Sequence, residues 1–529
     1  MSLCRVQAAG RSFLAAPGTP LHVALAQAGV GVETPCGARG YCRKCAVKVL
    51  TTPPPPTPAD LEQLAPQELE QGFRLSCQIR LTTNIAVALV PAALTDTVKA
   101  RLGRISGPIA TDPWAELPAT GRALGLAVDV GTTSVVAALL DLRSGEELTG
   151  AATPNPQAVH GADLMSRLTY ATAGPGNPRE LQALVAGAID RLVEQLCQRS
   201  GADPADIRAA AVCGNTCMHH LLLGLPVESL AVAPYTPVVT AGTERSAAEI
   251  GWRMLRPETV VYALPNVAGF VGADAVAAAV AAGLDQPGPP LALVDIGTNG
   301  EVVLRSGEEV FAASAPAGPA FEGGEISQGM RAAPGAIQGV LWDGADLALD
   351  VVRGAAARGI CGSGLLDAVA ALHAAGLLDY TGRIQQAGPQ AGRAAENRQS
   401  ISLAPGVALT QRDVRQLQLA KGAIRTGIDM VLRKAGVRTE ELEALLLAGS
   451  FGNYLRRESA LAIGLLPPLT ADRVRPVGNA AAVGAKLALL TKEGRRRCEA
   501  LAARIRHIDL ARHPDFEAAF IANLNLPQL

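Results

Sequence analysis

The feature that most constrains the fold is a motif that occurs twice. Residues 293–304 read LVDIGTNGEVVL, which is an apolar strand, a glycine turn carrying hydroxyl and amide groups, and a second strand. Residues 126–142, LAVDVGTTSVVAALLDL, repeat this layout upstream. One such turn is also typical of an ordinary β-hairpin, but two copies in one chain indicate two related lobes that face each other across a nucleotide.

Both turns suit a phosphate group. Glycine permits a tight turn and a close backbone approach, hydroxyl and amide side chains donate hydrogen bonds, and the aspartate at the end of each first strand can face a magnesium ion or an attacking water. The predicted phosphate-binding residues are Gly131, Thr132, Thr133, Ser134, Gly297, Thr298, Asn299 and Gly300. The predicted catalytic residues are Asp129, Asp295 and Glu301, although Glu301 equally fits a structural place at the start of a strand.

Two further glycine-rich segments belong to the predicted nucleotide site. In residues 359–367, GICGSGLLD, a glycine turn opens into an apolar helix whose N-terminus can meet phosphate, which makes Gly362, Ser363 and Gly364 candidates. In residues 445–454, LLLAGSFGNY, the glycine-rich stretch follows a buried strand and can lie flat beneath an adenine ring. The candidates there are Gly449, Ser450 and Gly452.

Four cysteines predict an iron–sulfur centre near the N-terminus. Cys36, Cys42 and Cys45 follow a C-x5-C-x2-C pattern on a glycine-rich loop, and Cys77 comes later. Three thiolates on one loop and a distant fourth are typical of 2Fe-2S ferredoxins. A zinc site is the alternative, but such sites usually contain two C-x2-C pairs, and this set contains one.

Length and composition set the domain plan. We predict a 2Fe-2S domain at residues 1–92, a linker at 93–123, a first lobe at 124–290, and a second lobe with a helical tail at 291–529. A net charge of −1 without a long basic stripe argues against a nucleic-acid partner. Because Pro, Gly or Asp interrupts each long apolar run, we expect no membrane segment and a cytoplasmic protein.

Several helices and strands can be predicted from local patterns. Thr19 is the expected N-cap of a helix with Pro20 at its first position. A helix over residues 59–72 is expected before Cys77, and a strand over 78–89 after it. In the second lobe we expect long helices at 365–378, 414–435 and 480–490.

The four glycine-rich segments, in this order, resemble the ATPase superfamily of actin, sugar kinases and heat-shock chaperones. Together with GNTCMHH (214–220), APY (233–235), SAPAGPAFEGGEI (314–326) and QLAKGAI (418–424), they make nearly the whole chain similar to the reductive activators of corrinoid proteins. The resemblance implies an α+β ferredoxin-like (β-grasp) N-terminal domain and an α/β two-lobed, actin-like (RNase H-like) ATPase body.

The same resemblance implies a function. The expected cofactors are a 2Fe-2S cluster, ATP and Mg²⁺, and the expected partners are a corrinoid protein and a low-potential electron donor. The activity would be ATP-dependent transfer of one electron from the cluster to the Co(II) corrinoid of the partner, which regenerates Co(I) for methyl transfer. A homodimer is compatible with the sequence.

Other functions remain open at this stage. The lobes can serve a nucleotide-binding sensor without turnover, or a small-molecule kinase, for which a cluster domain would be surplus. In activators of radical dehydratase-type enzymes, cysteines near such glycine turns bridge a 4Fe-4S cluster between subunits, and Cys361 with Cys213 or Cys217 is the pair to consider. His219 and His220 can face the cleft or be structural, with the structural role favoured. Asn215 and Thr216 are better site candidates by motif.

Overall fold

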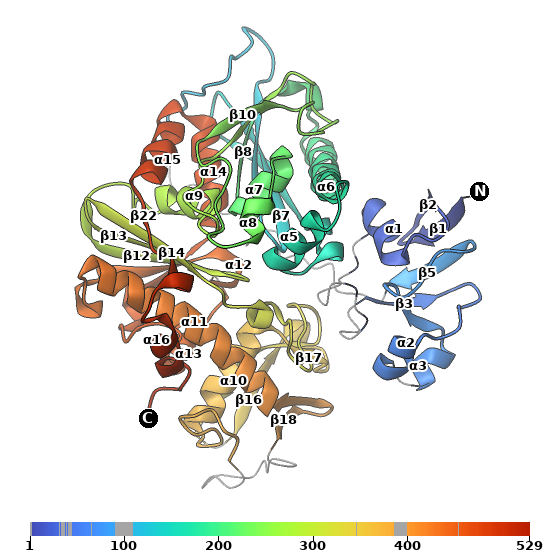
Figure 1. The fold of residues 1–529 in the computed structure, drawn as a ribbon, viewed down its shortest axis with the longest axis vertical. Helices are drawn as coiled ribbons and strands as arrows, with labels where there is room; N and C mark the ends of the chain where they lie inside the picture. Colours follow the sequence, from blue (N-terminus) through green and yellow to red (C-terminus); the bar gives the residue numbers. More distant parts are fainter. Residues whose placement is uncertain are drawn as a thin grey trace.

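The computed structural model describes residues 3–30, 32, 38, 40, 45–64, 66–89, 109–344, 346–385, 399–452 and 454–528. These residues form a small N-terminal domain beside a body of two lobes (Figure 1). None of the described helices is both long enough and apolar enough to span a bilayer.

The N-terminal domain is the predicted β-grasp fold. Its sheet has the strand order β2-β1-β5-β3-β4, with β1 parallel to β5 and its other pairs antiparallel. The strands are β1 (Cys4–Ala8), β2 (Arg11–Ala15), β3 (Ala46–Val49), β4 (Phe73–Leu75) and β5 (Ile85–Leu89). The helices are α1 (Leu21–Gln27), α2 (Pro58–Gln63) and α3 (Pro66–Glu70).

Three local predictions in this domain were wrong. Helix α1 begins at Leu21, with Pro20 as the N-cap and no side-chain capping bond. The helix expected over residues 59–72 is two short helices, because α2 ends at Gln63 and Leu64 has extended backbone. Cys77 lies in the turn that follows β4, and the next strand begins only at Ile85.

The first lobe contains a six-stranded sheet in the order β10-β11-β9-β6-β7-β8. Its strands are β6 (Leu124–Val130), β7 (Ser134–Asp141), β8 (Glu147–Pro154), β9 (Ile207–Gly214), β10 (Thr243–Ser246) and β11 (Val260–Ala263). Its helices are η1 (Pro156–His160), α5 (Leu164–Thr172), α6 (Asn177–Ser200), η2 (Pro204–Asp206), α7 (Thr216–Leu223), α8 (Glu228–Ala231) and α9 (Ala273–Ala281). β6 is buried along nearly its whole length, as expected for a strand covered on both faces.

The sheet of the second lobe has the order β21-β20-β12-β13-β14-β22, in which the first five strands repeat β11-β9-β6-β7-β8 and the sixth lies at the opposite edge from β10. Its main strands are β12 (Gly288–Ile296), β13 (Gly300–Gly307), β14 (Glu309–Ala315), β20 (Ala444–Ala448), β21 (Val474–Gly478) and β22 (Arg506–His507). Smaller sheets contain β15 (Ala336–Trp342), β16 (Leu347–Val351) and β17 (Gly359–Ile360), and β18 (Ser400–Ala404) with β19 (Val407–Thr410). Both repeated motifs therefore lie on matching antiparallel pairs, β6–β7 and β12–β13.

The helices of the second lobe include the three long ones that were predicted, two of them with different ends. They are η3 (Pro319–Glu322), η4 (Val352–Gly354), α10 (Gly362–Ala374), α11 (Gln411–Ala435), η5 (Thr439–Glu441), α12 (Gly449–Gly452), α13 (Arg457–Ala462), η6 (Ala471–Arg473), α14 (Ala480–Leu490), α15 (Lys492–Arg504), η7 (Leu510–Arg512) and α16 (Phe516–Ala522). α14 has the predicted bounds. α11 begins at Gln411 because Thr410 and Asp413 form a capping box ahead of the apolar pattern.

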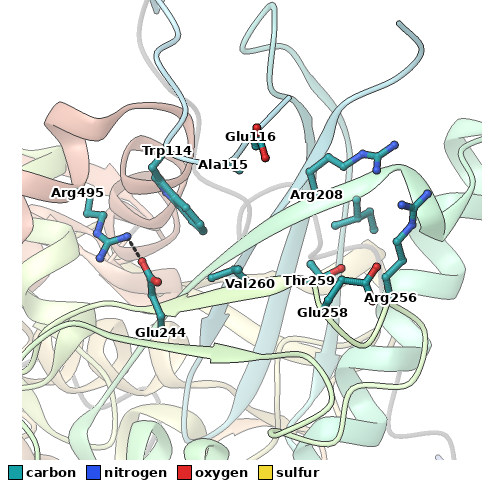
Figure 2. A pocket seen from close by; sticks show the side chains of 11 residues that line it. Trp114, Ala115, Glu116, Arg208, Glu244, Arg256, Glu258, Thr259, Val260 and Arg495 are labelled. Atoms are coloured by element: carbon teal, nitrogen blue, oxygen red, sulfur yellow. Dashed lines mark hydrogen bonds and ion pairs between the residues drawn. The ribbon is translucent and has the colours of Figure 1, made fainter. Parts of the chain in front are cut away.

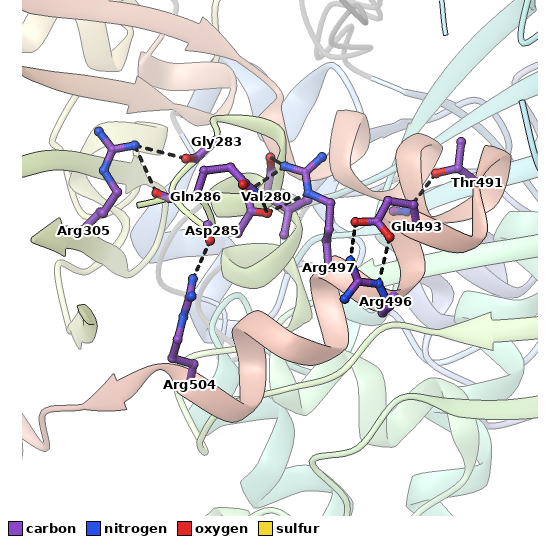
Figure 3. A network of polar contacts seen from close by, with 11 residues as sticks. Val280, Gly283, Asp285, Gln286, Arg305, Thr491, Glu493, Arg496, Arg497 and Arg504 are labelled. Carbon is purple, nitrogen blue, oxygen red and sulfur yellow. Dashed lines mark hydrogen bonds and ion pairs between the residues drawn. The ribbon is translucent and has the colours of Figure 1, made fainter. Parts of the chain in front are cut away.

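The two lobes are joined by a pair of packed helices, one from each lobe. α9 and α14 pack against each other so closely that a Cβ at Gly484 would lie 2.1 Å from the Ala277 carbonyl oxygen. Polar contacts extend this joint, because the Arg497 guanidinium donates to both carboxylate oxygens of Asp285 at 2.6 and 2.7 Å (Figure 3). Arg504 donates to the Asp285 carbonyl. The two lobes are therefore joined by a seam of packed helices and polar contacts.

The N-terminal domain touches the first lobe through α1. Ala26 packs with Val159 of η1 and Leu184 of α6 in a small apolar cluster, and Figure 1 shows α1 beside the first lobe. Gly29 lies against the Arg191 side chain of α6. The N-terminal domain thus packs against the first lobe, which contains the upstream copy of the repeated motif.

Candidate nucleotide and cysteine sites

Asp129, at the end of β6, is held by groups from two directions. Its Oδ2 accepts a hydrogen bond from Asn479 Nδ2 at 2.9 Å, across the seam between the lobes. The Cys213 thiol lies 3.9 Å from Oδ1. Burial raises the pKa of Asp129, while the hydrogen bonds from Asn479 and Cys213 lower it. Asp129 therefore has a fixed orientation and a partly stabilised charge.

Asp295, at the equivalent place on β12, has different surroundings. Burial, followed by the negative charge of Asp129, raises its pKa to about 7. Gly449 approaches it so closely that a Cβ there would lie 2.3 Å from Asp295 Oδ1, and Gly449 has a φ of +82°. The adenosine-loop candidate Gly449 thus lies directly against the second phosphate turn.

Two more carboxyl groups share this site. Burial and the charges of Asp274 and Asp295 raise the pKa of Glu301 well above its ordinary value. Asp274, in the first turn of α9, has its pKa raised to about 7 by burial and by Asp129 and Asp295. Sequence reasoning missed Asp274, although an acidic residue at the start of an apolar helix was a usable signal. Among the described residues, no three His, Cys, Asp or Glu side chains are arranged to hold a metal ion.

The two phosphate turns meet on one carboxylate that the sequence analysis did not single out. Thr133 Oγ1 and Thr298 Oγ1 both donate to Glu322 Oε1, at 2.9 and 3.0 Å. Glu322 lies within the SAPAGPAFEGGEI string, which pointed to the family but gave no role for the residue. The contact places the predicted phosphate-binding hydroxyls of both lobes around one point.

Neighbouring side chains fix the first phosphate turn. Asn215 Nδ2 donates to Thr132 Oγ1 at 2.9 Å, and Asn155 Nδ2 donates to the Gly131 carbonyl at 2.8 Å. The fully buried Arg167 donates to the Thr132 carbonyl. Asn215 thus stands at the turn, whereas Thr216 donates to the Ala268 carbonyl at 2.6 Å.

The glycine turn before α10 is explained by packing. A Cβ at Gly362 would lie 1.8 Å from the Phe321 carbonyl oxygen, and one at Gly364 would lie 2.0 Å from that of Ile337. Ser363 Oγ donates to the Gln338 carbonyl at 2.9 Å. A phosphate contact at these residues stays a prediction.

The predicted flat loop at residues 449–452 is a short helix, α12. The backbone of Ser450 and Gly452 lies within it, and the Phe451 ring packs on Phe321 with centroids 4.9 Å apart. Small residues are needed here because the helix begins against Asp295 and ends against the backbone of Leu447.

The paired histidines of α7 differ in their hydrogen bonds. His220 accepts from the Val238 N–H at Nε2, and its Nδ1 lies 2.8 Å from the Thr216 carbonyl. That is the structural role favoured from the sequence. His219 is buried and has no hydrogen-bond partner among the residues that the structure describes, and burial with the neighbouring His220 lowers its pKa to about 3.

Two of the four predicted cluster ligands can be described. Cys45 and Cys77 are buried in one apolar cluster with Leu64 and Leu75. The Gln78 amide nitrogen lies 3.3 Å from Cys77 Sγ and donates toward it. Cys36 and Cys42 lie outside the described residues. Buried sulfur atoms with an amide donor aimed at one of them fit the ligation of an iron–sulfur cluster.

The cysteines considered for a bridging 4Fe-4S cluster have separate partners. Cys361 Sγ donates to the Ile337 carbonyl at 3.3 Å, and Cys213 Sγ donates to that of Ala481 at 3.5 Å. Burial raises the pKa of Cys217 to about 12, which disfavours the thiolate that iron requires. No contact among the described residues pairs these thiols.

A separate pocket of about 370 Å³ opens at the edge of the first-lobe sheet (Figure 2). Trp114 and Arg495 stand at one end, and Arg208 and Arg256 at the other. None of its lining residues belongs to the predicted nucleotide site.

Two RNase H-like lobes with paired aspartate–glycine turns, joined to a β-grasp domain with buried cysteines, define a ferredoxin-linked protein of the actin-like ATPase class. Family models match accordingly: the 2Fe-2S iron-sulfur cluster binding domain at residues 4–82, the RACo middle region at 124–287, and the C-terminal (ASKHA) domain of RACo at 290–529. The chain belongs to the family of reductive activators of corrinoid proteins.

Named relatives cover most of the chain. The corrinoid activation enzyme RamQ of Eubacterium limosum is 34% identical over 75% of this chain and 70% of its own. The [Co(II) methylated amine-specific corrinoid protein] reductase of Methanosarcina barkeri is 28% identical over 70% of each chain. A solved reductive activator for a corrinoid, iron–sulfur protein matches with a TM-score of 0.71 at 28% identity, covering 99% of this chain and 98% of that one.

Proposed function

We propose that this protein is an ATP-dependent reductive activator that passes one electron to the Co(II) corrinoid of a partner protein and so regenerates Co(I). One relative is named a corrinoid activation enzyme and another a reductase of a Co(II) corrinoid protein, which supports this activity. The observation that carries the proposal is that Thr133 and Thr298, from two lobes, converge on one carboxylate, in a chain that also has a β-grasp domain with buried cysteines. A nucleotide site and a redox centre in one chain suit an energy-coupled electron transfer.

The N-terminal domain would hold the cluster through Cys36, Cys42, Cys45 and Cys77. When bound, a 2Fe-2S cluster supplies one electron at a low potential. The chain contributes the surroundings: Leu64 and Leu75 keep water from the buried cysteines, and the Gln78 amide donates to Cys77 Sγ. Such a donor stabilises negative charge on sulfur and tunes the potential.

The body would bind ATP between the lobes. Thr132, Thr133, Ser134 and Asn299 offer side-chain donors to phosphate oxygens, together with Thr298 and the turn glycines. Asp129, oriented by Asn479, would face the metal ion, while Asp295, whose pKa is about 7 without a metal ion, would accept a proton from the attacking water. Mg²⁺ would offset the mutual repulsion of Asp129, Asp274, Asp295 and Glu301, because divalent cations favour carboxylate oxygens.

Nucleotide can drive the electron transfer only by binding two states of the complex with different affinity. The corrinoid partner belongs to at least one of these states. We further assign domain borders near residues 92, 123 and 290, a cytoplasmic location, a low-potential electron donor that reloads the cluster, and a homodimer as the form to test first.

The test is a titration of the anaerobically reduced, cluster-loaded chain against a Co(II) corrinoid protein, with and without MgATP. The Co(I) absorption band should appear faster or further with MgATP. Asp295→Asn is the control, since it should bind nucleotide without promoting reduction. Equal reduction without nucleotide would remove the coupling, and no Co(I) under any condition would remove the proposed function.

A further inference from the structure

In the part of the chain that the structure describes, the side chains of the two phosphate turns meet at Glu322. A single oxygen, Oε1, accepts from Thr133 of the first lobe and from Thr298 of the second, at 2.9 and 3.0 Å. Each hydroxyl uses its one proton in this contact. While Glu322 is in place, neither threonine has a proton to donate to another anion.

Two hydroxyl donors that converge on one anionic oxygen are the arrangement that a phosphoryl oxygen requires. The carboxylate of Glu322 thus stands where the proposed nucleotide site needs a terminal phosphate oxygen. The two anions would also repel each other at this distance. The buried guanidinium of Arg167, which donates to the Thr132 carbonyl, attracts either of them.

The segment that carries Glu322 contacts the other parts of the proposed site. Gly318, just before η3, donates its N–H to the Thr298 carbonyl at 2.9 Å. Phe321 packs on the Phe451 ring of α12, and its carbonyl lies against Gly362 at the start of α10. A shift of Glu322 would therefore change the contacts that this segment makes with the second phosphate turn, α10 and α12.

We propose that Glu322 is a positioning residue that closes the cleft in the absence of nucleotide, by competing with the terminal phosphates of ATP for Thr133 and Thr298. ATP binding displaces the carboxylate, and residues 318–330 move with it. This inference rests on the proposed nucleotide site and adds that the nucleotide must displace the Glu322 carboxylate. It makes the move of η3 the first step that links ATP binding to the rest of the chain.

The test measures nucleotide dissociation constants of the full-length chain by calorimetry with Mg²⁺, using AMP, ADP and a non-hydrolysable ATP analogue. Glu322→Gln keeps the shape but removes the charge, and should bind the ATP analogue about tenfold more tightly, which corresponds to about 1.4 kcal/mol. AMP affinity should stay unchanged, because AMP lacks the phosphates that compete. Glu325→Gln is the matched control, since Glu325 is an exposed carboxylate three residues along.

A readout on the natural chain makes the test independent of whether the variant folds. Hydrogen exchange of the amides in residues 318–330 should speed up when the ATP analogue binds to the wild-type chain. Glu322→Gln should show the faster exchange without nucleotide. Weaker binding of the ATP analogue by Glu322→Gln, an equal change for AMP, or unaltered exchange would overturn the inference, whereas a wild-type chain that binds none of the nucleotides would overturn the proposed function itself.

Discussion

The two repeated hairpins, β6–β7 and β12–β13, share a sequence pattern and a place in their sheets but differ around their aspartates. Asp129 accepts from an amide of the opposite lobe and lies beside a thiol. No side chain among the described residues donates a hydrogen bond to Asp295, which instead faces Gly449. The repeated motif therefore gives two equivalent turns, but the residues around them differ. These surroundings give Asp129 a fixed orientation and leave Asp295 able to exchange a proton near neutral pH.

The largest effect should come from exchanging these two aspartates for asparagine. Asp295→Asn should lower kcat for ATP hydrolysis by about 10²- to 10⁴-fold, because a group that accepts the proton from water is lost. Asp129→Asn should act mainly by raising the dissociation constant of the magnesium nucleotide. Steady-state kinetics and calorimetry on both variants check this. Equal losses of kcat with unchanged affinities would show that the two aspartates have the same role.

A smaller but still sizeable loss should follow Gly449→Ala. The new Cβ would lie 2.3 Å from Asp295 Oδ1, so the carboxylate must shift, and kcat should fall about tenfold. The backbone strain of an alanine at a φ of +82° also costs about 1–2 kcal/mol of stability.

Gly436→Ala separates the two contributions to the Gly449→Ala result. Gly436 has a φ of +67°, and a Cβ there meets nothing within 4 Å. It should therefore lose similar stability in thermal unfolding but keep its kcat. A matching loss of kcat in both variants would show that Gly449 acts through stability rather than through Asp295.

Much of this asymmetry could not be read from the sequence. The repeat itself predicted two lobes and placed both aspartates at strand ends, because the hairpin pattern is local. Asn479 and Asp129 are 350 positions apart, so only the packing of α14 on the first lobe brings them together. The role of Glu322 could not be predicted from the sequence for the same reason, because its hydrogen-bond partners lie in turns of two separate lobes.

Local structure set by distant contacts was also hard to predict. The stretch at residues 449–452 was expected to be a flat loop, but it forms a helical turn, because the chain must turn at once after Gly449 meets Asp295. Residues 78–84 were expected to belong to a strand, because the buried Ile79 and Leu81 alternate with polar residues as strand residues do, but β5 begins only at Ile85. In both places the local pattern was correct about burial and wrong about conformation.

An intermediate effect should follow the removal of the donor that distinguishes Asp129. Asn479 both donates to Asp129 and caps α14 by accepting from the Ala482 N–H at 2.8 Å. Asn479→Ser keeps a capping oxygen but cannot reach Asp129, so the dissociation constant of the magnesium nucleotide should rise about threefold to tenfold at nearly unchanged kcat. Calorimetry measures this change. A fall in kcat like that of Asp295→Asn would instead show that the amide donor does not define the role of Asp129.

The smallest effect, and the most direct probe of the difference, is the pH dependence of stability without metal or nucleotide. The folded-state pKa of Asp295 is about 7, against an ordinary aspartate value near 4, so the folded chain binds an extra proton between these limits and loses stability as the pH rises through them. Asp295→Asn removes this loss. Its Tm should approach that of the wild type toward pH 5 and exceed it by on the order of 2 °C at pH 8.

The gain in Tm of Asp129→Asn should be smaller, because Asn479 and Cys213 already stabilise that carboxylate. Added Mg²⁺ should reduce the gain in Tm of both variants, because it neutralises the carboxylate charges. Thermal scans in EDTA and in Mg²⁺ distinguish these outcomes, and an equal gain for both variants at pH 8 would mean that the two aspartates feel the same electrostatic environment despite their different neighbours.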